Sequence, residues 1–577
     1  MGRALVSTAR SWPGGPGLNR PSGHVDLLFN YMVHMAVQIC SGSSSWWPNG
    51  EHTRQVFAVP VPGFACKIDQ LQAFAGSGAR DARLPAPPHG PPGTAHPTQE
   101  APMTQPAVVN GDLIMDGETL DVLDPSTGNL LDRTIRGTFE HIDAAVDAAR
   151  AATEGWRHTP YARRSQILRR VAELLRRDRE QLALLESRDT GKPLTQARAD
   201  ADVASRYFEF YANVMEAYFG HSPPANDDII AYTRHVPFGV TGHIIPWNYP
   251  LQIGCRTLAP AIAVGNCAVV KPAENAPLSV IKIAQLALEA GVPPGVINVV
   301  PGLGSEAGAA LAGHKGIDHL SFTGSVSVGA SVAKAAADNV VPVALELGGK
   351  SPNIVFPDAD LEQALPVIVK SMIQNAGQTC SAGSRLLVQE DARDAVISGL
   401  AQLLADLSIG AGPDDPDLGP LISAKQRDHV THMVARAVDA GFTQVVGPGN
   451  VTVPDKGFFF PPTLLDDVDP AAEIACQEAF GPVVAATTFS TVDDAISLAN
   501  GTDYGLIAAV WTKNLDTAHL LAEEVHAGQV YLNTYGAGGG VEHAFGGVKK
   551  SGYGREKGVE ALDAFSQTKS VVLKITR

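Results

Sequence analysis

The chain has 577 residues, of which 45% are hydrophobic and 18% are charged. This composition excludes disorder over the whole chain, and the length exceeds the ~250–300 residues that one hydrophobic core usually supports. The formal net charge of −16 at pH 7 speaks against a general nucleic-acid-binding protein, which would carry a basic excess.

Residues 1–102 differ in composition from the rest of the chain. They contain 13 of the 41 prolines and 12 of the 57 glycines, and runs such as residues 85–92 are typical of loops. No 20-residue apolar span occurs here, so no membrane helix is predicted. Three interpretations stay open: an irregular or disordered tail, a targeting segment, or upstream codons that are not translated. We favour the third, with Met103 as the true start.

The six cysteines show no CxxC pair and no regular spacing, and the 17 histidines are scattered. This pattern predicts neither a disulfide framework nor a metal site. It fits a reducing compartment, for which we expect the cytoplasm.

The elements after residue 103 begin with a strand and turn at 122–128. Helices are predicted at 141–154 and at 163–186, with Gly191 and Pro193 ending the second. From residue 236 strands and helices alternate. The strands are predicted at 240–245, 267–270, 296–300, 319–322 and 340–345, and the helices at 251–264, 278–290, 304–313 and 325–337. Such alternation predicts a parallel sheet covered on both faces.

A second α/β region is predicted over about 350–550, with strands at 353–356, 385–388 and 508–511. The chain closes with an alternating strand at 569–575, which has nothing after it to pair with. We expect this strand to pair elsewhere, with another subunit as one candidate.

Four polar segments follow predicted strands, at 246–250, 271–274, 323–325 and 346–349. Ligands of parallel sheets bind beyond the carboxyl ends of the strands, so these segments predict one site. Cys380, flanked by small residues, is a candidate nucleophile. Glu346 is a candidate base, and the Asn248 amide is a candidate donor to an oxyanion.

Together these segments resemble the aldehyde dehydrogenase superfamily, in order and with that family's spacing, over nearly all of 103–577. The matching segments are Pro-Trp-Asn-Tyr-Pro at 246–250, Lys-Pro-Ala-Glu at 271–274, Phe-Thr-Gly-Ser at 322–325, Leu-Glu-Leu-Gly-Gly-Lys at 345–350, Gly-Gln-Thr-Cys at 377–380, Glu-Ala-Phe-Gly-Pro at 478–482, and Phe-Gly-Gly at 545–547 with Ser-Gly-Tyr-Gly-Arg-Glu at 551–556.

The resemblance implies an α/β fold with three parts. These are a Rossmann-like parallel-sheet cofactor domain (103–218 and 238–347), an α/β catalytic domain (348–562) and a small β oligomerisation arm (219–237 and 563–577). Residues 1–102 fall outside all three parts.

The implied reaction is oxidation of an aldehyde to a carboxylic acid with NAD+, without acyl transfer to coenzyme A. The Cys380 thiolate attacks the aldehyde carbon, a step that suits a thiolate because it is strongly nucleophilic near neutral pH. Asn248 and the Cys380 backbone N–H stabilise the oxyanion, and Glu346 activates the water that hydrolyses the thioester. By the same resemblance, Glu556 relays protons outward.

The cofactor residues are also implied by position. Lys271 and Glu274 match the pair that holds the adenosine ribose, and a carboxylate there favours NAD over NADP, although NADP stays open. The other matching residues are those near the phosphates, Trp247, Gly324, Ser325 and Gly329, and those at the nicotinamide ribose and ring, Glu478 and Phe480.

The substrate residues implied by the resemblance are Tyr249, Arg256, Thr379, Ser381 and Phe545. The loop at 536–540 consists of glycine and alanine, which predicts a wide mouth for bulky or varied aldehydes. For Arg256 two interpretations stay open: a contact to a substrate carboxylate, or an internal salt bridge, which we favour.

Two alternatives to the hydrolytic enzyme are a coenzyme A-acylating semialdehyde dehydrogenase and an inactive structural homologue. The acylating branch usually lacks the glutamate at the position of Glu346, and an inactive homologue would lose Cys380 or Glu346, so both are disfavoured. The expected partners are a small aldehyde and further copies of the chain in a homodimer or homotetramer. No nucleic acid, membrane or metal is expected.

Overall fold

The computed structural model describes residues 103–536 and 540–576, so the predictions for 1–102 and for the centre of the 536–540 loop lie outside the described residues. Within these ranges the strands form four sheets, two large and two small. No helix in this part of the chain is long and apolar enough to cross a membrane. The predicted α/β class is confirmed.

The first large sheet has the strand order β19-β11-β10-β7-β8-β9-β2-β3. Its central strands β11, β10, β7, β8 and β9 are parallel, whereas β19, β2 and β3 run antiparallel to their neighbours. The strands are β2 (Ala107–Val109), β3 (Asp112–Ile114), β7 (Val240–Ile245), β8 (Cys267–Pro272), β9 (Ile297–Val299), β10 (His319–Thr323), β11 (Val343–Glu346) and β19 (Gly552–Tyr553).

Helices from the first half of the chain share one hydrophobic core with this sheet. They are α2 (Phe139–Arg157), α3 (Tyr161–Arg177), α4 (Arg179–Thr190), α5 (Leu194–Val214), α6 (Pro250–Val264), α7 (Leu278–Glu289), α8 (Ala309–Ala312) and α9 (Val326–Ala337), with short turns η1 (Met215–Ala217) and η2 (Gly304–Gly308). Late in the chain, α16 (Glu560–Ala564) joins the same core.

Several predicted elements have different bounds, and for two of them the reason is clear from the backbone. The helix predicted over 163–186 is two helices, because the backbone at Asp178 (φ −94°, ψ 15°) leaves the helical region between α3 and α4. The apolar spacing continues across this break since both helices pack on one core. The strand predicted from 340 begins at Val343, because Val340 is 91% exposed in a left-handed turn (φ 58°).

The second large sheet has the order β14-β15-β16-β13-β12-β17-β18 and is parallel except at β14. Its strands are β12 (Pro352–Val355), β13 (Arg385–Gln389), β14 (Thr443–Val446), β15 (Thr463–Asp466), β16 (Val483–Phe489), β17 (Ile507–Trp511) and β18 (Gln529–Leu532). Its helices are α10 (Leu361–Ile373), α11 (Arg393–Ala405), α12 (Ala424–Asp439), α13 (Glu473–Cys476), α14 (Val492–Asn500) and α15 (Leu515–Glu524), with the turns η3 (Gln374–Gly377), η4 (Glu390–Ala392), η5 (Gly412–Asp414) and η7 (Lys549–Ser551).

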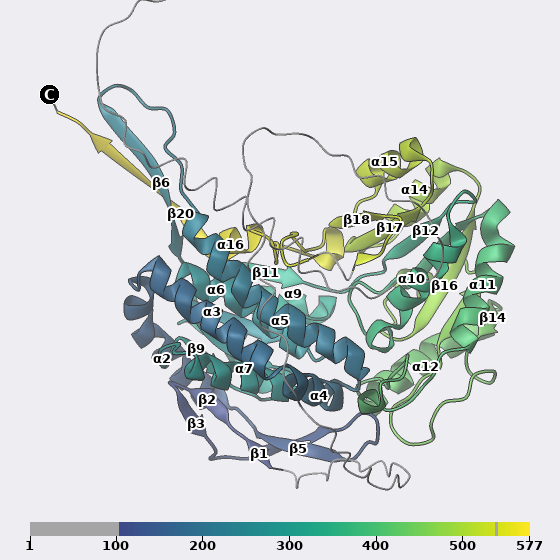
Figure 1. Ribbon diagram of the computed structural model, residues 1–577, viewed down its shortest axis with the longest axis horizontal. Coiled ribbons are helices and arrows are strands. Elements are labelled where there is room, and N and C mark those ends of the chain that lie inside the picture. Colours follow the sequence, from purple (N-terminus) through teal and green to yellow (C-terminus); the bar gives the residue numbers. More distant parts are fainter. Residues whose placement is uncertain (1–102, 537–539, 577) are drawn as a thin grey trace, which may run out of the picture. The chain divides into compact units, whose positions relative to one another are not determined.

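The two small sheets join segments that are distant in the sequence. One has the order β1-β5-β4, with β1 (Thr104–Gln105), β4 (Thr119–Leu123) and β5 (Leu130–Ile135). The other pairs β6 (Ile229–Pro237) with β20 (Ser566–Lys574) antiparallel along their whole length and extends away from the helices (Figure 1). The terminal strand therefore finds its partner within its own chain, in the segment predicted as the other half of the arm.

The order of the first large sheet explains where a ligand would bind. From β7 the chain moves outward through β8 and β9, and then returns to the other side of β7 through β10 and β11. The switch point lies between β7 and β10, and crevices at such points bind ligands beyond the strand ends. The segments after β7, β8, β10 and β11 that were singled out from the sequence all meet at this edge.

Candidate active site

Cys380 is positioned by an unusual turn after α10. Asn375, Ala376 and Gly377 all adopt left-handed backbone conformations, with φ of 50°, 54° and 72°. Such residues cost stability and cluster at functional sites, where the surrounding structure holds them in place. A Cβ on Gly377 would collide with the Gly481 carbonyl, and one on Gly349 would collide with the Cys380 carbonyl. The loop after β11 therefore lies directly against the nucleophile.

The surroundings of the half-buried Cys380 thiol disfavour its ionised form. Burial raises its pKa to about 12, although the Arg256 guanidinium and the Ser381 N–H oppose this shift.

Asn248 lies just beyond the end of β7 and is buried. Its Nδ2 donates to the Gln378 carbonyl over 2.9 Å, and the Asn375 Nδ2 donates to the Asn248 carbonyl over 2.8 Å. These bonds tie β7 to the turn that carries Cys380. Because an amide nitrogen has two hydrogens, one Asn248 N–H is left to donate to a substrate oxygen.

Glu346 is the last residue of β11 and is 3% exposed, and its Oε2 has no hydrogen-bond partner among the described residues. Burial and the nearby Glu556 charge raise the pKa of Glu346 well above its ordinary value. A Cβ on Gly546 would lie 2.8 Å from Glu346 Oε1. A carboxyl group with a raised pKa is a stronger base once ionised, which suits proton abstraction from water.

Arg256 on α6 forms an ion pair with Glu556, and both side chains are buried. This contact agrees with the favoured interpretation of Arg256 as salt-bridged. Phe545 lies beside two cations, since its ring centroid is 5.1 Å from Arg256 Cζ and 5.1 Å from Lys557 Nζ. Burial lowers the pKa of Lys557 to about 8.

The other residues assigned to the substrate side also lie next to Cys380. The Tyr249 hydroxyl is 2.8 Å from Thr379 Oγ1, and the Tyr535 hydroxyl donates to the Ser381 carbonyl over 2.8 Å. Tyr535 was not predicted, because nothing in its local sequence distinguishes it from an ordinary core tyrosine.

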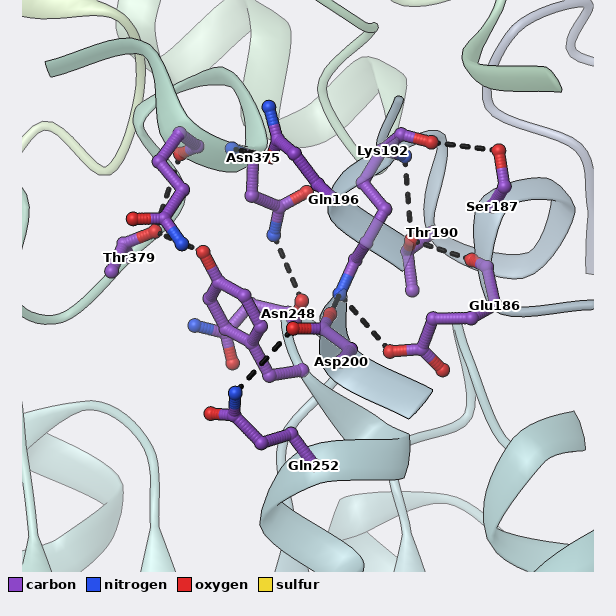
Figure 2. Close-up of polar contacts among 12 residues, drawn as sticks. Glu186, Ser187, Thr190, Lys192, Gln196, Asp200, Asn248, Gln252, Asn375 and Thr379 are labelled. Carbon is purple, nitrogen blue, oxygen red and sulfur yellow. Dashed lines mark hydrogen bonds and ion pairs between the residues drawn. The ribbon is translucent and has the colours of Figure 1, made fainter. Parts of the chain in front are cut away.

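A buried ion cluster of Glu186, Lys192 and Asp200 supports this region, and the sequence did not predict it (Figure 2). Lys192 Nζ lies 3.0 Å from Glu186 Oε1 and 2.5 Å from Asp200 Oδ2. The same ammonium group is 4.1 Å from the centroid of the Tyr249 ring, a cation–π contact. Charged residues near amphipathic helices are usually solvated, so their sequence does not indicate a buried cluster. The one local signal was the Gly-Lys-Pro run at 191–193, which predicted only the end of a helix.

Lys271 and Glu274 lie at the end of β8, with Lys271 Nζ 3.0 Å from Glu274 Oε2. The Lys271 side chain is 3% exposed and that of Glu274 is 40% exposed. The lysine therefore holds a carboxylate that still reaches solvent, as the predicted ribose site requires. The Lys271 ammonium and the Glu274 carboxylate thus have the polar atoms that could contact the adenosine ribose of a dinucleotide.

Gly324 and Gly329 flank the start of α9, where Ser325 is the N-cap and accepts from the Val328 N–H over 3.4 Å. A Cβ on Gly324 would lie 2.6 Å from the Phe322 ring, and one on Gly329 would lie 2.5 Å from Leu347. These glycines are therefore required for internal packing, in addition to any approach of a phosphate group to the helix N-terminus.

Glu478, Phe480 and Trp247 meet beside the loop after β11. The Gly349 N–H donates to Glu478 Oε1 over 3.0 Å, and burial raises the pKa of Glu478 to about 7. Phe480 adopts a left-handed backbone (φ 53°) and contacts Trp247 edge to face, with the ring centroids 5.3 Å apart. The predicted nicotinamide-side residues thus lie near the nucleophile's loop and not at the adenosine end.

Comparison with known proteins agrees with this arrangement. The aldehyde dehydrogenase family model matches residues 114–571. The mitochondrial aldehyde dehydrogenase of Homo sapiens is 39% identical over 489 residues, which are 82% of this chain and 94% of that protein. The hydroxyisobutyraldehyde dehydrogenase of Mycolicibacterium austroafricanum is 40% identical over 472 residues, 81% of this chain and 93% of that protein.

Among solved structures, an NAD+ complex of an aldehyde dehydrogenase from Bacillus cereus is 39% identical, with a TM-score of 0.80. The match covers 82% of this chain and 97% of that one. The chain therefore belongs to the aldehyde dehydrogenase family, and aldehyde oxidation is its general reaction.

We expect Lys192→Met to destabilise the protein by about 3–5 kcal/mol, because it leaves two carboxylates buried without their cation. The folded-state pKa of Asp200 is already raised to about 6. Without the lysine, ionised carboxylates become still less favourable in the folded state, so the deficit should grow as the pH rises above about 6 and shrink below it. Urea unfolding at several pH values measures this.

The matched control is Lys550→Met, which breaks the exposed ion pair with Asp503 (Nζ–Oδ2 2.6 Å). We expect a change below about 1 kcal/mol there. Equal, pH-independent losses in both variants would contradict a special role for the buried cluster.

Proposed function

We propose that this chain oxidises an aldehyde to its carboxylic acid with NAD+, through a thioester on Cys380 that water hydrolyses. The observation that carries this proposal is the convergence of Cys380, Asn248 and Glu346 at one edge of the first large sheet. Among the described residues, one Asn248 N–H and Glu346 Oε2 have no hydrogen-bond partner there. The NAD+ in solved relatives such as the Bacillus cereus enzyme supports the choice of cofactor.

In the first half of the reaction the Cys380 thiol gives its proton to solvent, and the sulfur then attacks the aldehyde carbon. The resulting oxyanion accepts hydrogen bonds from the free Asn248 N–H and from the Cys380 backbone N–H. One such donor typically contributes about 2.7–4 kcal/mol of transition-state stabilisation. Bound NAD+ supplies the acceptor for the hydride that leaves the carbon, and the carbon becomes a thioester.

In the second half Glu346 removes a proton from water while the water oxygen attacks the thioester carbon. The C–S bond breaks, the acid leaves, and the sulfur is released as a thiolate that can take a proton back from solvent. Glu556 lies close enough to raise the pKa of Glu346, so it is the group to which we assign onward transfer of the proton. Burial of both carboxyl groups keeps their charges coupled.

The cofactor preference rests on Glu274. Its partly exposed carboxylate, held by Lys271, would accept from ribose hydroxyls and would repel a 2′-phosphate. We therefore propose NAD as the preferred cofactor, with NADP used more weakly.

For the substrate we propose a wide mouth that accepts bulky or varied aldehydes. The support is the glycine and alanine content of the loop at 536–540, whose centre lies outside the described residues. Because Arg256 already pairs with Glu556, we do not assign it to a substrate carboxylate.

We propose a homodimer or homotetramer assembled through the arm formed by β6 and β20. Large apolar side chains are exposed on this arm, namely Ile230, Tyr232, Val572 and Leu573. A cytoplasmic location is proposed because the cysteines in the described part of the chain, Cys255, Cys267, Cys380 and Cys476, are free. The division into cofactor domain, catalytic domain and arm, with the boundaries predicted from the sequence, is part of the same proposal.

Glu346→Gln should block hydrolysis and spare acylation. We expect a burst of about one NADH per active site, followed by turnover reduced ~10²–10⁴-fold, since that is the usual contribution of general acid–base catalysis. Stopped-flow absorbance measures both phases, and Cys380→Ser is the control that should abolish the burst. Rapid turnover of the wild type only with added coenzyme A would instead support the acylating alternative.

Glu274→Gln should weaken discrimination against NADP. The variant keeps the size of the side chain and removes the charge that repels a 2′-phosphate, so kcat/KM with NADP should rise relative to that with NAD by about tenfold. Steady-state kinetics with both cofactors measure the ratio. An unchanged ratio would remove Glu274 from the cofactor assignment.

The substrate proposal is tested by comparing kcat/KM for acetaldehyde, benzaldehyde, succinic semialdehyde and betaine aldehyde. We expect activity with benzaldehyde at least comparable to that with acetaldehyde, because one wide apolar mouth discriminates weakly by size. A strong preference for acetaldehyde alone would contradict the wide mouth.

A further inference from the structure

A continuous row of buried polar side chains leads away from Glu556 into the first large sheet, which contains β7 and β10. Ser321 Oγ on β10 lies 3.2 Å from Glu556 Oε1, and Thr257 Oγ1 on α6 lies 3.2 Å from Ser321 Oγ. His243 Nδ1 on β7 is 2.7 Å from Thr257 Oγ1, and Thr241 Oγ1 is 2.7 Å from His243 Nε2. All five side chains are less than one tenth exposed.

The direction of every hydrogen bond in this row follows from the charge on Glu556. An ionised carboxylate paired with Arg256 only accepts, so Ser321 donates its single hydroxyl hydrogen to it. Thr257 must then donate to Ser321, which leaves His243 Nδ1–H to donate to Thr257.

The far end of the row is consistent with this direction. Burial lowers the pKa of His243 to about 3, so the ring is neutral and carries one N–H. With that hydrogen on Nδ1, Nε2 accepts from the Thr241 hydroxyl. All the O–H and N–H dipoles of the row therefore point toward Glu556.

The row does not reach solvent. Beyond His243 it ends at Thr241, whose hydroxyl shares its one hydrogen between His243 Nε2 at 2.7 Å and the Cys267 carbonyl at 3.2 Å, in the interior of the sheet. A backbone carbonyl cannot accept a proton at neutral pH and pass it on. The row is therefore suited to orienting the Glu556 carboxylate, and not to conducting protons to solvent.

We propose that Ser321, Thr257 and His243 are positioning residues that fix the orientation of the Glu556 carboxylate toward Glu346. This inference rests on the proposed function, because it assigns a role within the hydrolysis step. Aligned hydrogen bonds polarise one another in a low-dielectric interior, so the remote members act on Glu556 through Ser321.

Other charged and titratable groups also lie around Glu556 and His243. Those around Glu556 are Arg256 on α6, Glu346 on β11, Tyr207 and Tyr211 on α5 and the adjacent Lys557, while His319 on β10 faces His243. Because these groups remain in every variant below, the differences between variants report on the row itself.

The test is the pH dependence of kcat in variants that break the row at successive links. Ser321→Ala removes the direct donor and should move the acid-side midpoint up by about one to two pH units. Thr257→Val, which is nearly isosteric, should move it in the same direction by about 0.2–0.5 unit, since cooperative effects are a fraction of one bond. His243→Leu should resemble Thr257→Val, and His243→Asn, which keeps a donor near Thr257, should restore the wild-type midpoint.

Two controls separate this effect from a loss of packing. Thr463→Val removes a buried hydroxyl that donates to the Pro461 carbonyl in the other large sheet, and should leave the midpoint unchanged. In a Glu556→Gln background, Thr257→Val should cause no further shift. An unmoved midpoint in Ser321→Ala, or a shift by Thr257→Val that persists without Glu556, would overturn the proposal.

A uniform loss of kcat at all pH values with an enlarged solvent deuterium isotope effect would also overturn it, because that result indicates proton conduction. If the wild type forms no NADH from any aldehyde, the proposed function fails by itself. The row is then tested by thermal unfolding: the Tm difference between wild type and Thr257→Val should be largest near neutral pH and should shrink as the pH falls through the range, about 4 and below, in which carboxylates protonate. A pH-independent difference would reject the row's action on Glu556.

Discussion

The site depends on the buried ion pair of Arg256 and Glu556, which lies beside the buried Glu346 and the half-buried Cys380 thiol. These four side chains come from four different segments, and a buried charge is costly unless it is paired. Because Arg256 is engaged with Glu556, the charged forms of Glu346 and Cys380 are less favoured. This explains why burial raises the pKa of both Cys380 and Glu346.

Much of the remaining structure serves to hold this group in place. Side-chain hydrogen bonds from Asn248 and Asn375 join the end of β7 to the nucleophile's turn. The ion cluster around Lys192 supports Tyr249 from behind. Close backbone contacts at Gly349 and Gly377 leave no room for a side chain, so the two large sheets meet at the site through backbone as well as through side chains.

The sequence predicted the parts of the fold that depend on local patterns. The strand at 240–245 has the predicted bounds because a fully buried strand is a continuous apolar run. The break at Asp178 was missed, since apolar periodicity is unaffected by one residue that leaves the helix while both helices pack on the same core. The candidate site residues were found from their positions after strands and from the family resemblance.

What could not be predicted depends on contacts between distant segments. Arg256 and Glu556 are 300 residues apart, and neither local sequence indicates that the other is its partner. The raised pKa of Cys380 reflects the several elements packed around its thiol, and the cluster of Glu186, Lys192 and Asp200 looks like solvated helix surface in the sequence. The row from Glu556 to Thr241 likewise combines β7, α6 and β10, with a glutamate from near the C-terminus.

The short strand β19 has a consequence for how the protein is made. Gly552 pairs with Glu346 and Tyr553 pairs with Leu345, so the edge of the cofactor sheet is completed by residues near the end of the chain. A ribosome must therefore synthesise some two hundred further residues after β11 before that strand gains its last neighbour. Until then the edge beside Glu346 is an open strand, available to other unfinished chains, and Glu346 is among the last groups to reach its final environment.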